Sequence, residues 1–121
     1  MEFGSLRTRE EFDRVFREGR RWRGDYVNVV FVRNEDDPLV DEVMTKIGIA
    51  VSRRYGNAVQ RNTFRRRLRE VVRSSGLPSG SYFFSPRRGW DETTFAGLKS
   101  DITRLCVEGL GHGLKKVTNE R

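Results

Sequence analysis

Arginine is the side chain whose number and spacing in this chain most plainly suggest a chemistry. Of the 24 lysines and arginines among the 121 residues, 20 are arginines. Eight of these lie between positions 53 and 73, where Glu70 is the one acid, so this segment carries the whole net charge of +7. A guanidinium group can form two parallel hydrogen bonds to a phosphate. Such a concentrated basic segment therefore indicates a polyanionic partner.

The spacing of these arginines predicts a single cationic helix face. Four of them recur at every fourth residue, namely Arg61, Arg65, Arg69 and Arg73. On an α-helix this spacing keeps the side chains on one side for about 18 Å. Arg66 and Arg67 widen this arginine stripe, and only Glu70 is placed to relieve the repulsion. A charge run is ordinarily a solvated face, but the uncompensated repulsion here favours phosphate binding.

Residues that could catalyse a reaction are scarce. His112 stands in a glycine-rich tail and is interpreted as a solvated side chain, and Cys106 is interpreted as core packing. One cysteine and one histidine cannot make a four-ligand zinc site, and a lone cysteine forms no internal disulfide, which suits a reducing compartment. The acidic run at positions 35–42 could bind Mg²⁺, but a solvated loop is the better interpretation. A nuclease that acts by itself is therefore disfavoured.

The composition indicates one small domain with a modest core. Charged residues make up 34% of the chain and hydrophobic residues 36%. No apolar run approaches the ~18 residues of a membrane span, and no secretory leader opens the chain, so we expect a cytoplasmic protein. Residues 1–5 resemble a translated cloning remnant, residues 6–110 are expected to form the domain, and residues 111–121 are expected to form a flexible tail.

The helices that position the arginines follow from hydrophobic spacing and end signals. Thr8 and Glu11 predict a capping box for a helix over residues 9–18, which ends at Gly19. The basic helix is expected to begin after Asn57 and to end near Ser74. Its inward residues are Phe64, Leu68, Val71 and Val72. A last helix is predicted from about Asp91 to residues 109–113, with Phe95, Leu98, Ile102, Leu105 and Cys106 pointing inward.

Three strand regions are predicted between these helices, over residues 26–32, 43–51 and 81–85. The first region admits a split into two strands. In the second, large apolar residues alternate with a smaller face that holds Lys46, Gly48 and Ala50, and we expect that smaller face to admit something flat. The order α-β-β-(β)-α-β-α predicts an α+β fold built as a two-layer α/β sandwich.

The basic segment also resembles a known sequence signature. Residues 56–70 read GNAVQRNTFRRRLRE, which closely resembles the signature of the bacterial ribonuclease P protein component, G-N-A-V-x-R-N-x-x-K-R-x-x-R-E. The one departure is Arg65, where lysine is usual, and it keeps the charge. Residues 11–19 and 47–54 resemble the family's first helix and the strand before the signature, and residues 82–87 fit its next strand more loosely. The resemblance covers residues 6–108.

This resemblance implies a protein subunit of an RNA enzyme. The family's RNA subunit, with Mg²⁺, cuts precursor tRNA to make the mature 5′ end, while the protein binds that RNA and holds the 5′ leader of the precursor in a cleft. The implied partners are the ribonuclease P RNA and precursor tRNA, with no membrane and no obligatory protein partner. Mg²⁺ is expected to be bound mainly by the RNA, with no metal site and no catalytic residue in the protein. The implied fold has a left-handed β-α-β crossover at the basic helix, whereas the general preference is right-handed.

The resemblance implies two sets of binding residues. The set that faces the catalytic RNA consists of Arg61, Asn62, Arg65, Arg66 and Arg69. The set that borders the leader cleft consists of Phe12, Phe16, Tyr26, Val30, Ser52, Arg53 and Arg54. Aromatic rings suit such a cleft because they stack on the splayed bases of a single strand. Helix periodicity alone predicts Phe12 and Phe16 as core residues; with the resemblance, we expect one at the cleft edge and the other mostly buried.

Two other binding functions fit parts of the pattern. A ribosomal or chaperone-like RNA-binding protein of similar fold would also place a basic helix beside a sheet. Of these hypotheses, only a ribonuclease P subunit would enhance cleavage of precursor tRNA when the protein is added to its RNA partner. A helix-turn-helix DNA reader fits poorly, because no tight helix and turn precede the basic helix. Trp22 and Trp90 are either surface anchors or partial core, and the sequence does not distinguish these roles.

Overall fold

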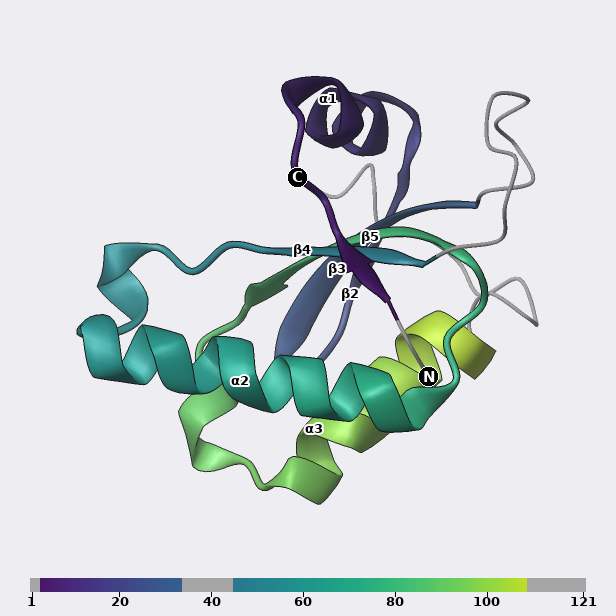
Figure 1. The fold of residues 1–121 in the computed structure, drawn as a ribbon. Coiled ribbons are helices and arrows are strands. Elements are labelled where there is room, and N and C mark those ends of the chain that lie inside the picture. The colour runs from purple at the N-terminus through teal and green to yellow at the C-terminus, as the bar shows by residue number, and fades with distance from the viewer. Residues whose placement is uncertain (1–2, 34–44, 109–121) are drawn as a thin grey trace.

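The computed structural model describes residues 3–33 and 45–108, and Figure 1 shows their fold. The acidic run at 35–42, His112, the predicted end of the last helix and the predicted tail lie outside the described residues. Within the described ranges, no helix is long and apolar enough to cross a membrane.

One mixed sheet of five strands forms the centre of the fold (Figure 1). Its strands, in spatial order, are β1 (Gly4–Ser5), β4 (Lys46–Ile49), β5 (Gly80–Pro86), β3 (Val27–Arg33) and β2 (Arg20–Arg23). β4 is parallel to both of its neighbours, whereas β3 is antiparallel to β5 and β2. β3 corresponds to the first predicted strand region, which is not split, and β2 is a further strand that precedes this region. β1 comes from residues that the sequence analysis set aside, and it pairs Gly4 with Lys46.

Helices cover both faces of this sheet (Figure 1). α2 (Ala58–Ser75) and α3 (Phe95–Ile102) lie on one face, and α1 (Arg9–Glu18) lies on the other. The short helical turns η2 (Arg53–Tyr55) and η3 (Trp90–Glu92) precede α2 and α3, and η4 (Thr103–Glu108) extends α3. The predicted α+β class is confirmed. α1 adds a partial layer to the expected two-layer sandwich, because the sheet carries apolar side chains on both faces.

β4, α2 and β5 form the crossover that carries the arginines. β4 and β5 are parallel neighbours, and α2 is the long helix of the segment that joins them. In Figure 1 both strands run from right to left, α2 returns beneath the sheet, and β5 lies behind β4. This path is a left-handed crossover, as the resemblance implies and against the general right-handed preference.

Side-chain caps determine where α1 and α2 begin. Thr8 Oγ1 accepts the N–H of Glu11 at 3.1 Å, and the Glu11 carboxylate accepts the N–H of Thr8 at 3.0 Å. Asn57 and Gln60 form the same reciprocal pair at the start of α2, with distances of 2.8 and 2.9 Å. α2 ends at Gly76, whose φ of 61° lies in the left-handed region that glycine adopts without a Cβ penalty. Both predicted helix starts are confirmed.

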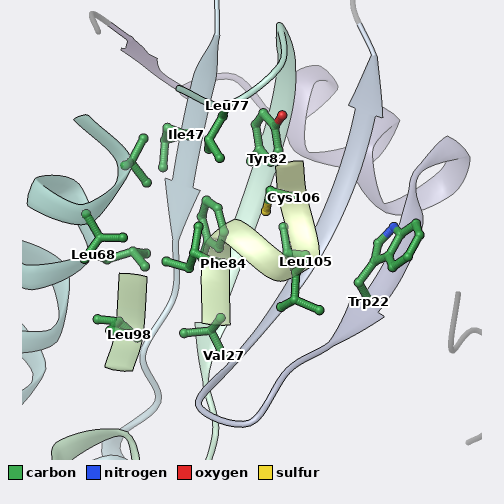
Figure 2. Close-up of a cluster of buried hydrophobic side chains, with 14 of the residues drawn as sticks. Trp22, Val27, Ile47, Leu68, Leu77, Tyr82, Phe84, Leu98, Leu105 and Cys106 are labelled. Atoms are coloured by element: carbon green, nitrogen blue, oxygen red, sulfur yellow. The ribbon is translucent and has the colours of Figure 1, made fainter. Parts of the chain in front are cut away.

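The larger core lies between the sheet and the pair α2 and α3 (Figure 2). α2 contributes four side chains that are 0% exposed, as the spacing predicted: Phe64, Leu68, Val71 and Val72. Tyr82 and Phe84 contribute from β5, with ring planes nearly parallel and centroids 5.9 Å apart. Trp22 and Trp90 are 4% and 3% exposed and belong to the same cluster, so both are core residues.

A smaller core lies between the sheet and α1, and it consists of Leu6, Val15, Val30 and Val32 with Phe12 and Phe83 partly buried against it. Gly48 on β4 is part of this contact. A Cβ at Gly48 would lie 2.9 Å from the Leu6 side chain and 3.0 Å from the Phe12 ring. The sequence predicts open space on the small face of β4, and at Gly48 this prediction is wrong, because the Leu6 and Phe12 side chains fill the space there.

The last helix begins later than predicted. Asp91 belongs to η3, and Thr94 caps α3 by accepting the N–H of Gly97 at 3.1 Å. The inward position predicted for Phe95 is wrong, since this first residue of α3 lies outside the buried cluster and is 45% exposed. The other four predicted inward residues, Leu98, Ile102, Leu105 and Cys106, are buried.

Asp101, which the sequence analysis did not single out, ties α3 to the turn between β2 and β3. Its buried carboxylate accepts the N–H groups of Asp25, Tyr26 and Val27 at 2.9, 2.8 and 3.1 Å. Arg104 donates to the same carboxylate at 2.8 Å. Three backbone donors and a guanidinium therefore compensate the cost of burying this charge.

Candidate nucleic-acid interface

The arginine stripe lies on the side of α2 that faces away from the core. Leu68 and Val72 are fully buried, whereas the nearby Arg66 and Arg69 are exposed. Arg61 and Arg65 are half-buried. No acidic residue of the described ranges forms an ion pair with Arg61, Arg65, Arg66 or Arg69. These four arginines therefore keep their positive charge, which attracts a polyanion.

Contacts inside the fold hold some of these arginines without neutralising them. Arg65 Nη1 donates to Asn62 Oδ1 at 3.2 Å. The Arg67 guanidinium lies 5.9 Å from the centroid of the Trp90 ring, within the range of a cation–π contact. Arg61 has a buried Nε that lacks a hydrogen-bond partner among the described residues.

Glu70 does not relieve the stripe as the sequence analysis expected. It is exposed, and it forms no ion pair with Arg66 or Arg67 within the described part of the chain. An exposed pair of this kind contributes only about 0–1 kcal/mol, so solvation of the separate charges competes with it. Arg67 contacts the Trp90 ring instead.

A second feature, the Phe16 hollow, lies on the face of the sheet that carries α1. It has a volume of about 230 Å³ and is lined by Phe16, Arg21, Trp22, Arg23, Asn28, Val29, Val30, Phe83 and Ser85. Phe16 is 39% exposed, and its ring meets the Phe83 ring edge-on with centroids 4.7 Å apart. An exposed ring beside cations suits the bases and phosphates of a single nucleic-acid strand.

Strand register places a polar row across this hollow. Arg23 on β2 lies opposite Asn28 on β3, and Asn28 lies opposite Ser85 on β5. Asn28 and Ser85 are only half-buried, and Asn28 Oδ1 has no hydrogen-bond partner among the described residues. This row presents hydrogen-bonding groups at right angles to the strands, next to the Phe16 ring.

Of the predicted cleft residues, Phe16 and Val30 line the Phe16 hollow. Phe12 is half-buried and packs edge-on against Phe83 at 5.9 Å, so Phe16 is the exposed member of the phenylalanine pair. Tyr26 does not line the hollow, because it packs against the larger core on the opposite face of the sheet.

The remaining predicted cleft residues lie elsewhere. Ser52 and Arg53 are exposed where η2 begins, and neither lines the Phe16 hollow. Arg54 lines a different hollow, beside Arg88 and Trp90. These three residues therefore do not line the Phe16 hollow, and their assignment to the leader cleft stays a prediction. β4 ends at Ile49, and the chain then turns through η2 into α2.

Lys46, the cation on the small face of β4, contacts the first helix. Its Nζ donates to Glu11 Oε2. Partial burial raises the pKa of Glu11, but the hydrogen bonds from Lys46 and from the backbone N–H groups of Arg7 and Thr8 outweigh it and lower the pKa from 4.5 to about 2. This ion pair links α1 to β4 of the sheet.

Sequence reasoning missed Arg21, Arg23, Asn28, Phe83 and Ser85 as residues of the hollow. One signal could have found Asn28: it interrupts a run of valines in a strand whose alternate residues face opposite sides of the sheet. The arginines of β2 gave no such signal, because their position depends on how β2 pairs with β3. Among the described residues, no group of three or more histidine, cysteine, aspartate or glutamate side chains could hold a metal ion.

The fold and the stripe define a class: a small basic α+β protein with a cationic helix of the kind that binds nucleic acid. The family model described as Ribonuclease P matches residues 2–108. The chain therefore belongs to the ribonuclease P protein family, whose members are subunits of an endoribonuclease holoenzyme that acts in tRNA processing.

Individual relatives agree with this assignment. The chain is 34% identical over 109 residues to the ribonuclease P protein component of Coprothermobacter proteolyticus, covering 88% of this chain and 81% of that protein. A solved RNase P protein from Thermotoga maritima matches with a TM-score of 0.72 and 27% identity, covering 86% of this chain and 96% of that one. The Staphylococcus aureus RNase P protein, at 21% identity and a TM-score of 0.70, covers 94% of this chain and 100% of its own and supports the fold alone.

Proposed function

We propose that this chain binds the RNA subunit of ribonuclease P through the arginine stripe and binds the 5′ leader of precursor tRNA in the Phe16 hollow. By holding both RNAs, it promotes endonucleolytic removal of the leader to give the mature tRNA 5′ end. The observation that carries the proposal is that Arg61, Arg65, Arg66 and Arg69 of the stripe, all within the family signature, form no ion pair with an acid of the described ranges.

The stripe suits a folded RNA because its contacts do not require base recognition. Arg65 and Arg69 lie one helical turn apart on a rigid helix whose opposite face is fully buried. Each guanidinium that contacts a phosphate releases condensed counterions, which gives affinity that falls as salt rises. Asn62 accepts a hydrogen bond from Arg65 and so restricts the position of that guanidinium.

The Phe16 hollow suits a single strand because it combines an exposed ring with cations and hydrogen-bonding groups. Phe16 stacks on a base, a contact worth about 1–3 kcal/mol that tolerates any sequence. Arg21 and Arg23 provide cations for the backbone phosphates. Phe16 and Val30 place the hollow on the face of the sheet that carries α1, whereas the stripe lies on α2, which covers the other face (Figure 1). The two RNAs therefore do not compete for one surface.

Catalysis in this proposal belongs to the RNA subunit. The described residues offer no group of three metal-ligating side chains, so no step is assigned to a protein-bound metal. Mg²⁺ held by the RNA would supply the activated nucleophile and charge stabilisation that phosphodiester cleavage requires. The protein positions substrate, needs no protein partner for this task, and works in the cytoplasm, where tRNA precursors are processed.

Reconstitution tests the proposal. The protein alone is incubated with precursor tRNA and Mg²⁺, and then with a bacterial ribonuclease P RNA added. We expect no cleavage by the protein alone, because the proposal assigns catalysis to the RNA subunit. We expect faster cleavage at the mature 5′ end in the mixture than with the RNA alone. Cleavage by RNA-free protein would overturn the proposal, as would binding to the RNA without any gain in cleavage, which is the behaviour of a ribosomal or chaperone-like RNA-binding protein.

A further inference from the structure

Arg54 and Arg88 come from different parts of the chain yet line one hollow, the Arg88 hollow. Arg54 belongs to η2, just before α2, and Arg88 follows β5 on the way to α3. The hollow has a volume of about 450 Å³, and Tyr55, Trp90 and Asp91 also line it. None of the predicted or proposed roles above uses Arg88 or this hollow.

The walls of the Arg88 hollow are fixed by the larger core. Tyr55 packs against that core, and Trp90 is 3% exposed with its ring 5.0 Å from the Phe64 ring. Arg54 Nη2 donates to Tyr55 Oη at 3.2 Å, and its guanidinium lies 5.1 Å from the Tyr55 ring centroid. Arg54 is thus held in place before any ligand arrives, which lowers the entropy cost of binding.

The two arginines keep their charge. Neither Arg54 nor Arg88 forms an ion pair with an acid of the described ranges, and Arg88 has no hydrogen-bond partner there either. Asp91 is exposed at the same hollow but pairs with neither of them. The residues that line the hollow therefore carry a net charge of one positive unit. Arg67, which does not line the hollow, places a further positive charge near the Trp90 ring.

The position of the hollow favours the RNA that meets α2 over the leader. Tyr55 and Trp90 belong to the face of the sheet covered by α2 and α3, opposite the Phe16 hollow. Along the chain, η2 leads into the start of α2, so Arg54 precedes the stripe. A folded RNA seated on α2 therefore passes the Arg88 hollow.

We propose that the Arg88 hollow is a second phosphate site, in which Arg54 and Arg88 bind a backbone phosphate of the RNA subunit. It would extend the RNA contact from α2 to the connection between β5 and α3, which lies outside the signature. The inference rests on the proposed function, because its ligand is the RNA that function assigns to α2.

Two opposite substitutions test this site, with the ribonuclease P RNA as the probe. Arg88→Ala should weaken binding of the full-length protein to that RNA about three- to tenfold and flatten the slope of log K against log salt by roughly 0.7–0.9. Asp91→Asn should strengthen binding, because it removes the one negative charge at the hollow. Arg20→Ala is the matched control, because Arg20 is an exposed arginine on the far edge strand β2 that forms no ion pair with the other described residues. We expect this substitution to change RNA binding little.

The outcomes separate this site from the proposed function. If Arg65→Glu with Arg69→Glu weakens RNA binding while Arg88→Ala and Asp91→Asn match the control, the Arg88 hollow is not a phosphate site and the proposed function stands. If none of these variants changes RNA binding, the proposed function fails as well. If Arg88→Ala instead reduces the holoenzyme's preference for leader-bearing over leaderless tRNA, the hollow takes the leader and the assignment to the RNA subunit is wrong.

Discussion

Phe16 and Phe12 lie one helical turn apart, and their surroundings give them different roles. Phe12 is half-buried against Phe83 and Gly48, while Phe16 is 39% exposed at the Phe16 hollow. We expect Phe16→Ala to lower the affinity of the holoenzyme for leader-bearing precursor tRNA by about 1–3 kcal/mol, through loss of base stacking. Affinity for mature tRNA and for the RNA subunit should scarcely change. Equilibrium binding to the three RNAs measures this.

Phe95→Ala is the control for that measurement. Phe95 is 45% exposed, like Phe16, but it lies on α3 on the opposite face of the sheet. A thermal melt of each variant is needed, since truncation of a buried phenylalanine costs about 3–5 kcal/mol of stability. Equal weakening of leader-bearing and leaderless tRNA by Phe16→Ala, or loss of its fold, would show that Phe16 is a core residue.

Glu11 links the charge of one side chain to the attachment of α1. Its pKa falls from 4.5 to about 2 in the folded protein, so the ionised form stabilises the fold at every pH above 4.5. That stabilisation is lost as the pH drops from 4.5 towards 2. Glu11→Gln should therefore lower the free energy of unfolding at neutral pH, and its difference from the original protein should shrink across this interval. Urea unfolding at a series of pH values measures it, and a difference independent of pH would contradict the ion pair with Lys46.

At the scale of the element, α2 has two faces with separate tasks. Its apolar face is fully buried in the larger core, and its arginines face outward. The double variant Arg65→Glu with Arg69→Glu should weaken binding to the RNA subunit without unfolding the domain. Each lost phosphate contact should flatten the slope of log K against log salt by roughly 0.7–0.9. A salt titration of RNA binding measures both effects.

Charge reversal on α1 provides the matched control for that variant. Arg9 and Arg17 are exposed, and Arg9→Glu with Arg17→Glu produces the same net charge on a helix beyond the other face of the sheet. If both double variants weaken RNA binding equally, net charge rather than the stripe determines affinity. If neither does, α2 is only a solvated face.

At the scale of the whole molecule, one sheet separates two surfaces of different chemistry. The stripe on α2 offers cations to a folded RNA, and the Phe16 hollow beside α1 offers a ring and hydrogen-bonding groups to a single strand. Because the sheet is rigid, binding of one RNA also fixes the position of the other.

This arrangement predicts a lower Mg²⁺ requirement for cleavage. The protein brings cations that the RNA subunit otherwise takes from solution. The Mg²⁺ concentration at half-maximal cleavage of precursor tRNA should therefore be lower with the protein than with the RNA alone. Cleavage rates over a Mg²⁺ titration, with and without protein, measure this, and coincident curves would contradict it.

Local sequence determined the helix starts and the buried face of α2. Thr8 with Glu11, and Asn57 with Gln60, satisfy backbone donors within one turn, so their effect does not depend on the rest of the chain. Spacing alone also placed Phe64, Leu68, Val71 and Val72 in the core, because any helix with that pattern must bury the same side. The family signature, with its arginines, is likewise contiguous in the chain and can therefore be recognised without a structure.

Only the tertiary structure decided which residues meet across the sheet. Arg23, Asn28 and Ser85 form one row because of strand register. Tyr26 precedes β3 in the turn after β2 and packs against the larger core on the other face of the sheet. Arg54 meets Arg88 because the chain returns through β5 beside η2, more than thirty residues later. Asp101 likewise stabilises the β2–β3 turn, because its carboxylate accepts hydrogen bonds from a segment more than seventy residues earlier. Such pairings depend on long-range contacts, which no local pattern of residues encodes.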